Sequence, residues 1–193
     1  MSSIRLFILS SFDGFGPMHG HRLRAIAEKM QVPLWTDISV GAVYGAMNRL
    51  AAEGLLKEAG REQEGNRPTR QLYEITAQGR AALSELRRDG LSEIWFKPDP
   101  FDLALAWMDA KTIKTFPALL AARLAKVRAQ LTDARARAEE HRAHMPLTKQ
   151  WALRHTEYRL EAEVKYLTDL LKAAKDIAAE KPKAMPVFSA KSR

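Results

Sequence analysis

Hydrogen-bonding and cationic side chains recur in residues 39–54 at the spacing that a DNA-reading helix needs. Tyr44, Asn48 and Arg49 fall on the side of a predicted helix opposite its apolar residues. A phenol and a guanidinium can donate hydrogen bonds to phosphate oxygens, and an amide can reach a phosphate or a base edge. The residues just before them are small or polar, which lets a helix approach base edges closely: Ser39, Val40, Gly41 and Ala42. This pattern predicts insertion into the major groove of duplex DNA.

A second group of cations surrounds a polar loop, residues 61–69, between two predicted strands. Arg61, Arg67 and Arg70 lie near the two ends of this loop, and Lys57 lies in the strand before it. A hairpin of this kind can place cations in the minor groove or against its phosphates. Two glutamates at positions 62 and 64 oppose these charges, so the loop is not a uniformly basic patch.

Both patterns also have a purely structural interpretation. Tyr44 can be a half-buried packing residue and Arg49 a solvated charge, because half-exposed tyrosines and arginines are common. The loop can be an ordinary charged hairpin turn. At the level of function, the alternative is a winged module that binds another protein and does not bind DNA.

The elements that must position these residues follow from apolar periodicity and from breaker residues. Helices are expected at residues 4–12, 18–30, 40–53 and 77–96, and strands at 55–60 and 70–76. Ser39 and Thr76 are predicted N-caps, and Gly54 is the glycine expected to end the third helix. Three helices followed by a two-stranded hairpin are typical of a winged helix-turn-helix domain.

The remainder of the chain is predicted to be helical. A short helix is expected at residues 101–108, and two apolar stripes after residue 112 are separated by Met145-Pro146. The stripes predict an antiparallel hairpin that packs on a second subunit, or alternatively an intramolecular bundle. We therefore predict a mainly α fold with a small β-hairpin wing. Its expected parts are a winged helix-turn-helix DNA-binding domain at 1–96, a linker with a short helix at 97–111, an antiparallel helical dimerisation and effector domain at 112–180, and a disordered basic tail at 181–193.

Several motifs, in the right order, resemble those of the PadR family of transcriptional regulators. The matching segments are Gly16-Pro17-Met18-His19-Gly20, residues 39–50 running into 53–56, residues 67–70, and residues 73–80. The resemblance implies a homodimeric repressor that grips a pseudo-palindromic operator and is released by a small aromatic effector such as a phenolic acid. A multidrug-responsive regulator is the alternative within the family. The chain departs from the family pattern at His21, where tyrosine is frequent, and at Gly45, where proline is frequent.

An effector would need a concave apolar site with a few polar anchors. Arg123, Arg154 and His155 are candidates to bind a carboxylate, for which the arginine fork is well suited. The candidate walls are aromatic: Trp107, Phe116, Trp151 and Tyr158. Trp95 and Phe96, beside the linker, are candidates to line a dimer cavity instead. The alternative is that each aromatic residue belongs to an ordinary core.

Composition limits the class of protein. A hydrophobic share of 46% in 193 residues is enough for a core, and a formal net charge of +8 favours anionic partners. Without cysteine the chain has neither disulfides nor thiolate metal sites. We find no apolar run of membrane-spanning length and no secretory leader at the start, so we expect a cytoplasmic protein without a membrane partner.

Other candidate chemistry is weaker. His141 and His144 lie three residues apart beside Glu140, but no third strong ligand is evident and we predict no metal site. Asp99 and Asp102 are expected to cap the helix that starts near residue 101, because carboxylates are stabilised at a helix N-terminus, and not to act as general acid and base. With no phosphate-binding glycine loop and no nucleophile elbow, we predict a protein that is not an enzyme and needs no cofactor.

Overall fold

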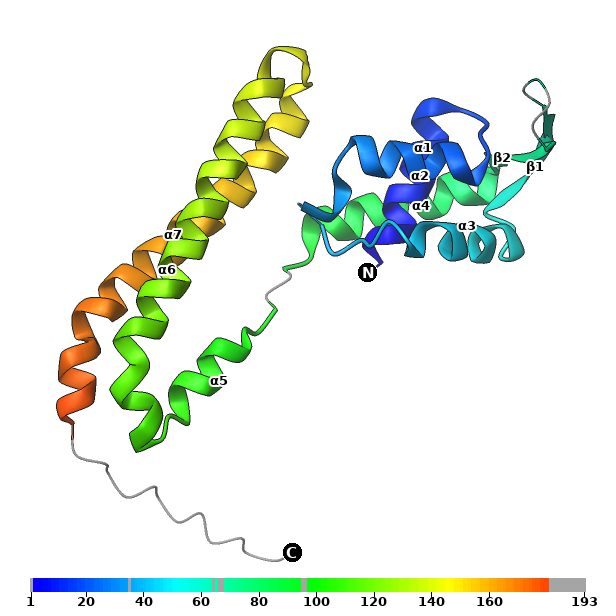
Figure 1. Ribbon diagram of the computed structural model, residues 1–193. Helices are drawn as coiled ribbons and strands as arrows, with labels where there is room; N and C mark the ends of the chain where they lie inside the picture. The colour runs from blue at the N-terminus through cyan, green and yellow to red at the C-terminus, as the bar shows by residue number, and fades with distance from the viewer. Residues whose placement is uncertain (1, 35, 64, 66–67, 95–96, 181–193) are drawn as a thin grey trace, which may run out of the picture. The chain divides into compact units, whose positions relative to one another are not determined.

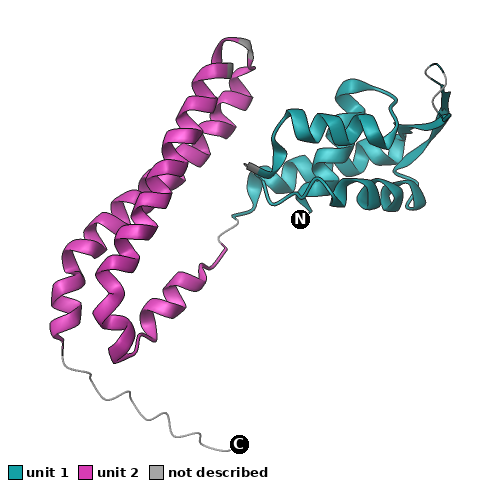
Figure 2. Cartoon of the chain, viewed as in Figure 1, with its two compact units in different colours: residues 1–96 teal, residues 97–193 magenta. Residues whose placement is uncertain are grey.

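The computed structural model describes residues 2–34, 36–63, 65, 68–94 and 97–180. The chain divides into two compact units, Met1–Phe96 and Lys97–Arg193, each with its own core (Figure 2). Among the described residues, no helix combines the length and the apolarity that a membrane crossing requires.

The N-terminal unit consists of helices and one antiparallel hairpin (Figure 1). Its elements are α1 (Ser3–Phe15), α2 (Gly20–Lys29), the 3-10 turn η1 (Val32–Leu34), α3 (Ala42–Ala52), β1 (Leu56–Glu62), β2 (Arg70–Ile75) and α4 (Ala77–Ser92). The two strands pair from Leu56 opposite Ile75 to Glu62 opposite Arg70, with an irregularity between Glu58 and Gly60. The predicted class, mainly α with a small hairpin, is confirmed.

The core of this unit forms where the apolar faces of the helices meet. Phe12 of α1, Leu23 of α2 and Leu50 of α3 are almost completely buried, and Leu83 of α4 joins them. Each such side chain contributes about 1.5–3 kcal/mol relative to an exposed one. This burial fixes which side of α3 remains available at the surface.

The first two helices differ from the predicted bounds. The helix α1 runs to Phe15, past the predicted end at residue 12, and its C-cap is Gly16, whose positive φ of 74° glycine adopts easily. The helix α2 begins at Gly20 and not at Met18, because Met18 pairs with Tyr73 of β2 in an isolated antiparallel bridge.

The prediction that Ser39 caps α3 is wrong. The N-cap is Gly41, which makes no side-chain capping bond, and Ser39 lies in the turn before it. The predicted end is confirmed: Gly54 has a φ of 75°, and its N–H donates to Ala51 O at 3.0 Å. Leu55 N–H donates to Leu50 O at 2.9 Å, which completes the double-bonded helix ending that a left-handed glycine permits.

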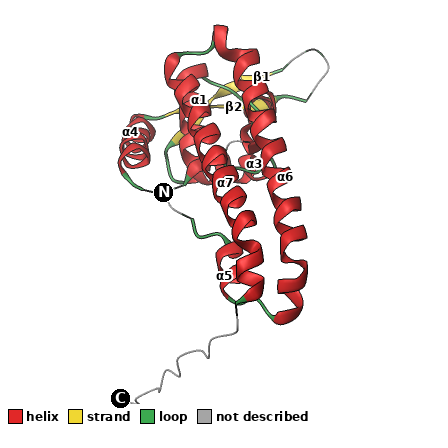
Figure 3. Cartoon of the chain, turned by 90° about the vertical axis from the view of Figure 1, so that its left-hand side faces the viewer, coloured by secondary structure: helices red, strands yellow, loops and turns green. Residues whose placement is uncertain are grey.

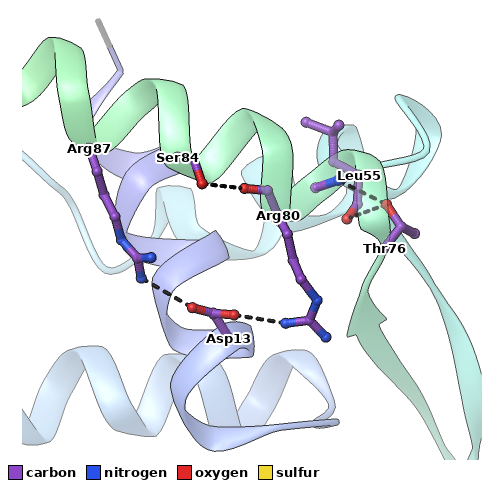
Figure 4. A network of polar contacts seen from close by, with 7 residues as sticks. Asp13, Leu55, Thr76, Arg80, Ser84 and Arg87 are labelled. Atoms are coloured by element: carbon purple, nitrogen blue, oxygen red, sulfur yellow. Dashed lines mark hydrogen bonds and ion pairs between the residues drawn. The ribbon is translucent and has the colours of Figure 1, made fainter.

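The helix α4 is anchored at its first turn and along one side (Figure 4). As predicted, Thr76 caps it, since its hydroxyl accepts from Gly79 N–H at 3.0 Å. Asp13 of α1 receives Arg80 at 2.7 Å and Arg87 at 3.2 Å, which ties α1 to α4. The helix ends at Ser92, earlier than predicted.

The C-terminal unit is a long helical hairpin with a short helix beside it (Figures 1 and 3). It contains α5 (Pro100–Ala106), α6 (Ala110–His141), the 3-10 turn η2 (Arg142–His144) and α7 (Leu147–Ala179). Phe116, Leu120 and Leu124 of α6 pack with Leu167 and Ala174 of α7. The tail predicted at 181–193 lies outside the described residues.

Candidate nucleic-acid interface

The helix α3 has one buried and one exposed side. Exposure is high on the predicted DNA-reading side, where Tyr44 is 51% exposed and Asn48 and Arg49 are also exposed. The opposite side is inside the core: Val43, Ala46, Met47 and Leu50. Tyr44 and Asn48 are four residues apart and therefore lie one above the other along the helix. A phenol, an amide and a guanidinium thus face outward from one helix.

The start of α3 presents mostly backbone. Ser39 and Gly41 are exposed and Val40 is half-buried. A Cβ placed on Gly45 would meet only the end of the Arg49 side chain, at 3.6 Å. The Arg49 side chain therefore lies along the surface of α3 beside Gly45, where no other side chain covers the backbone. An accessible backbone with few side chains is suited to close approach to a nucleic acid.

Tyr44 is held by a neighbour that sequence reasoning did not identify. A Cβ on Gly20 would lie 2.7 Å from the Tyr44 ring, so the ring packs on the bare first turn of α2. The two interpretations of Tyr44 are therefore compatible, because the ring packs on α2 while half of the side chain stays exposed. The sequence feature that permits this contact is Gly20, the glycine at the first position of α2.

The predicted cations of the hairpin differ in their environments. Lys57 forms an ion pair with Glu74 at 3.0 Å, so its charge is already partly compensated. Arg70 is half-buried at the start of β2, and exposed Arg61 has no ion pair to any described residue. Arg67 lies outside the described residues. Of the predicted set, Lys57 is the least available to phosphate.

The structure adds His19 to this region. Its Nδ1 accepts the Arg22 N–H at 3.0 Å and so caps α2. Its Nε2 lies 3.5 Å from Arg70 Nη1 and 3.8 Å from a Glu62 oxygen. Burial, and next the charge of Arg70, lower the pKa of His19 below its usual value, whereas Glu62 raises it. Sequence reasoning included His19 in a motif but gave it no role.

Other cations of the N-terminal unit are engaged in ion pairs. Arg5 pairs with Glu53 at 2.6 Å, and Asp13 holds two arginines of α4. In contrast, Arg49 of α3 and Arg22 of α2 form no ion pair with a described residue. Uncompensated cations are the ones that can exchange counterions for DNA phosphates.

Two of the effector candidates already have structural roles. Phe116 is 4% exposed and packs in the core between α6 and α7, so it has a core role in this structure, and its role as a wall of an effector site stays a prediction. Arg123 Nη2 donates to Asp99 at 2.5 Å and to Glu163 at 3.0 Å, and its guanidinium lies 4.3 Å from the Phe101 ring centroid. The carboxylates that bind Arg123 in this structure belong to the chain itself.

The remaining described candidates are spread over the hairpin. Trp151 and Tyr158, with Arg154 and His155 between them, are exposed near the start of α7, and the Arg154 guanidinium lies 5.2 Å from the Trp151 ring centroid. A pocket of about 210 Å³ beside Trp151 is smaller than the about 300 Å³ that drug-sized ligands need. Trp107, at the end of α5, is separated from them by most of the length of α6. Trp95 and Phe96 lie outside the described residues.

The weaker candidates can also be placed. Asp99 accepts the Phe101 N–H at 2.9 Å, so it caps α5 as predicted. Among the described residues, no three histidine, aspartate or glutamate side chains lie together as a metal site would require. The side chains of His141 and His144 lie outside that description.

Comparison with known proteins relates the chain to one family. Residues 8–85 match the model of the transcriptional regulator PadR-like family. No curated protein matches the chain.

Solved structures match over nearly the full length. Bacillus subtilis PadR in complex with operator DNA has a TM-score of 0.69 and 19% identity, over 90% of this chain and 98% of that one. The PadR-like regulator BC1756 from Bacillus cereus has a TM-score of 0.62 and 18% identity, over 91% and 99%. B. subtilis PadR in complex with p-coumaric acid has a TM-score of 0.67 and 18% identity, over 89% and 98%. At these identities the likeness establishes the fold: a winged helix unit followed by a helical region.

Proposed function

We propose that this chain, whose residues 8–85 match the model of the transcriptional regulator PadR-like family, is a repressor that binds a pseudo-palindromic DNA operator as a homodimer. The observation that carries the proposal is the exposed side of α3, where Tyr44, Asn48 and Arg49 stand opposite a fully buried side. A helix of this composition, next to a two-stranded wing, has the parts that direct readout of a major groove needs.

The proposed contacts divide into two kinds. Arg49 and Arg70 have no carboxylate partner among the described residues and bind phosphates, which sets affinity and register. Tyr44 adds a phosphate contact, and Asn48 reaches a base edge from the middle of α3. Ser39, Val40 and Gly41 let the start of the helix enter the groove, and Lys57 and Arg67 support the wing.

A homodimer is supported by apolar side chains left at the surface of the C-terminal unit. Leu103 and Trp107 are each 67% exposed and Tyr158 is 53% exposed. Large apolar side chains at such exposure are expected to pack on a partner. A two-fold pair would place two α3 helices in successive major grooves, about 34–36 Å apart.

We further propose that a small aromatic acid releases the repressor, since B. subtilis PadR has been solved with p-coumaric acid. The exposed candidates for this site are Trp107, Trp151, Arg154, His155 and Tyr158, with Trp95 and Phe96 outside the described residues. In a thermal-shift screen, an aromatic acid that binds should raise the melting temperature and should also release DNA. X-ray scattering should then show a changed separation of the two DNA-binding units. A release-competent acid that leaves the scattering profile unchanged would contradict a change in dimer geometry.

The test of DNA binding uses Arg49→Ala, Arg70→Ala and the matched control Lys57→Ala. With an operator selected from a random duplex pool, each arginine variant should lower the log–log salt slope of affinity by about one. Lys57→Ala should change it less, because Glu74 already neutralises that ammonium. A protein-interaction module predicts no duplex affinity even at low ionic strength, and that outcome would overturn the proposal.

A further inference from the structure

His19 lies between the two parts of the chain proposed to touch DNA. On one side it caps α2, whose first residue, Gly20, supports the ring of Tyr44. On the other side its Nε2 lies 3.5 Å from Nη1 of Arg70, the first residue of β2. The preceding residue, Met18, exchanges backbone hydrogen bonds with Tyr73 at 3.0 and 2.9 Å. One residue thus connects the first turn of α2 with the loop end of the hairpin, where Arg70 begins β2.

The capping bond defines the protonation state of the ring. Because Nδ1 accepts a backbone N–H, it carries no proton, and a neutral ring then has its proton on Nε2, near Glu62. Arg70 therefore lies beside Nε2 without donating to it, and Glu62 is the residue opposite Arg70 in the register of the two strands. A second proton on the ring would place an N–H against the N–H of Arg22 and a positive charge beside Arg70.

The charged and titratable groups around His19 come from three elements. Among the described residues they are His21 and Arg22 of α2, Glu62 of β1 and Arg70 of β2. Burial is the largest influence on the His19 pKa, three of the four groups also lower it, and Glu62 alone opposes them. The neutral ring is consequently the form that this environment stabilises near pH 7.

We propose that neutral His19 is a positioning residue that couples the first turn of α2, and through it Tyr44, to Arg70 of the wing, and that its protonation uncouples them and weakens DNA binding. The proposal rests on the proposed function and adds a regulatory property to the same site. Protonation removes the N-cap and repels Arg70 from the cluster. The pKa of His19 is lower in the folded protein than its usual value of 6.5. The stabilisation of the folded state by neutral His19 is therefore complete above about pH 6.5 and is lost as the pH falls through the lowered pKa.

The first experiment measures affinity for the selected operator at fixed ionic strength between about pH 7.5 and pH 5.5, a range that spans the ordinary histidine pKa. The wild-type protein should lose about fivefold in affinity on acidification, the effect of one lost cap. In His19→Asn, a strong N-cap that neither titrates nor reaches the wing, the affinity should be lower at neutral pH and independent of pH. The control His21→Asn removes one of the groups that lower the pKa of His19 but keeps His19 itself, so this variant should still lose affinity on acidification.

A second variant applies even if His19→Asn fails to fold. Glu62→Gln removes the one group that raises the pKa of His19, so the loss of affinity should move to lower pH. An unchanged midpoint in Glu62→Gln, or affinity that increases on acidification and no longer does so in His19→Asn, would overturn the proposal. The latter result would mean that protonated His19 binds phosphate directly.

An NMR titration separates this proposal from the proposed function, because it needs no DNA. The backbone amides of Arg22 and Tyr73 should shift with the same midpoint as the His19 ring. If they do so while wild-type protein binds no duplex, the coupling stands and both the DNA-binding function and its regulation by His19 are overturned. If the protein binds DNA but these amides do not follow His19, the positioning role is overturned and the function stands.

Discussion

A single glycine, Gly79, decides how closely α4 packs on the segment that joins α3 to β1. Gly79, in the first turn of α4, is buried against the backbone of Leu55, and a Cβ there would lie 2.2 Å from the Leu55 oxygen. Gly45 of α3 has open space around it, with Arg49 at 3.6 Å. Both residues are helical, so the same substitution tests tertiary contact separately from helix propensity.

We predict that Gly79→Ala destabilises the protein by about 1–3 kcal/mol or more, because the backbone of Leu55 must move. Gly45→Ala should instead stabilise it by up to about 1 kcal/mol, through the better helix propensity of alanine. Urea unfolding of both full-length variants, followed by circular dichroism, measures the difference. Equal midpoints for the two variants would mean that α4 does not pack on Leu55 as closely as described.

At the scale of elements, one arginine fastens the short helix α5 to the long hairpin. Asp99 caps α5 and binds Arg123 of α6, which also binds Glu163 of α7 and covers the ring of Phe101. The Phe101 N–H, and next the Arg123 side chain, lower the pKa of Asp99 below its usual value. The stabilisation that ionised Asp99 gives is therefore complete above about pH 3.8 and is lost as the pH falls through the lowered pKa of Asp99.

We predict that Arg123→Met releases α5, since methionine keeps apolar volume but cannot bridge two carboxylates. Amide hydrogen exchange in Pro100–Ala106 should become faster in this variant, and Arg123→Lys should give an intermediate rate. The matched control is Arg135→Met, which breaks an α6–α7 ion pair with Glu161 but touches nothing in α5. Unchanged protection of α5 in Arg123→Met would show that its apolar contacts suffice.

At the scale of the whole molecule, the proposed activity requires two copies of the chain. Leu103 of α5 and Trp107, the C-cap of α5, are each 67% exposed, so both leave apolar surface in contact with water. Packing on a second subunit would remove this surface from water, and a charge placed there would oppose association.

We predict that Trp107→Glu shifts the protein from dimer toward monomer and weakens operator binding, because one subunit grips only half of the site. Light scattering coupled to size-exclusion chromatography gives the mass, and Lys114→Glu, at an exposed polar position of α6, is the control for added negative charge. A Trp107→Glu protein that remains fully dimeric would place the interface elsewhere on the chain.

The sequence alone determined the features that depend on local periodicity and on single conformational preferences. Apolar spacing separated the buried side of α3 from Tyr44, Asn48 and Arg49, and Gly54 and Thr76 marked a helix end and a helix start. It failed where distant residues replaced a local preference. Met18 leaves the expected helix because Tyr73 offers it backbone hydrogen bonds, and α3 begins without the expected serine cap.

Only the tertiary structure decided which side chains meet across the chain. His19 and Arg70 are 51 residues apart, and Asp99 and Arg123 are brought together by the packing of α5 on the hairpin. A sequence pattern contains residue types at fixed local spacing but no distances between separate elements. For this reason the sequence indicates Arg123 as a free anion-binding group, whereas in the structure it binds Asp99 and Glu163. For the same reason the sequence gives His19 no role, whereas in the structure it lies beside Arg70 of the wing.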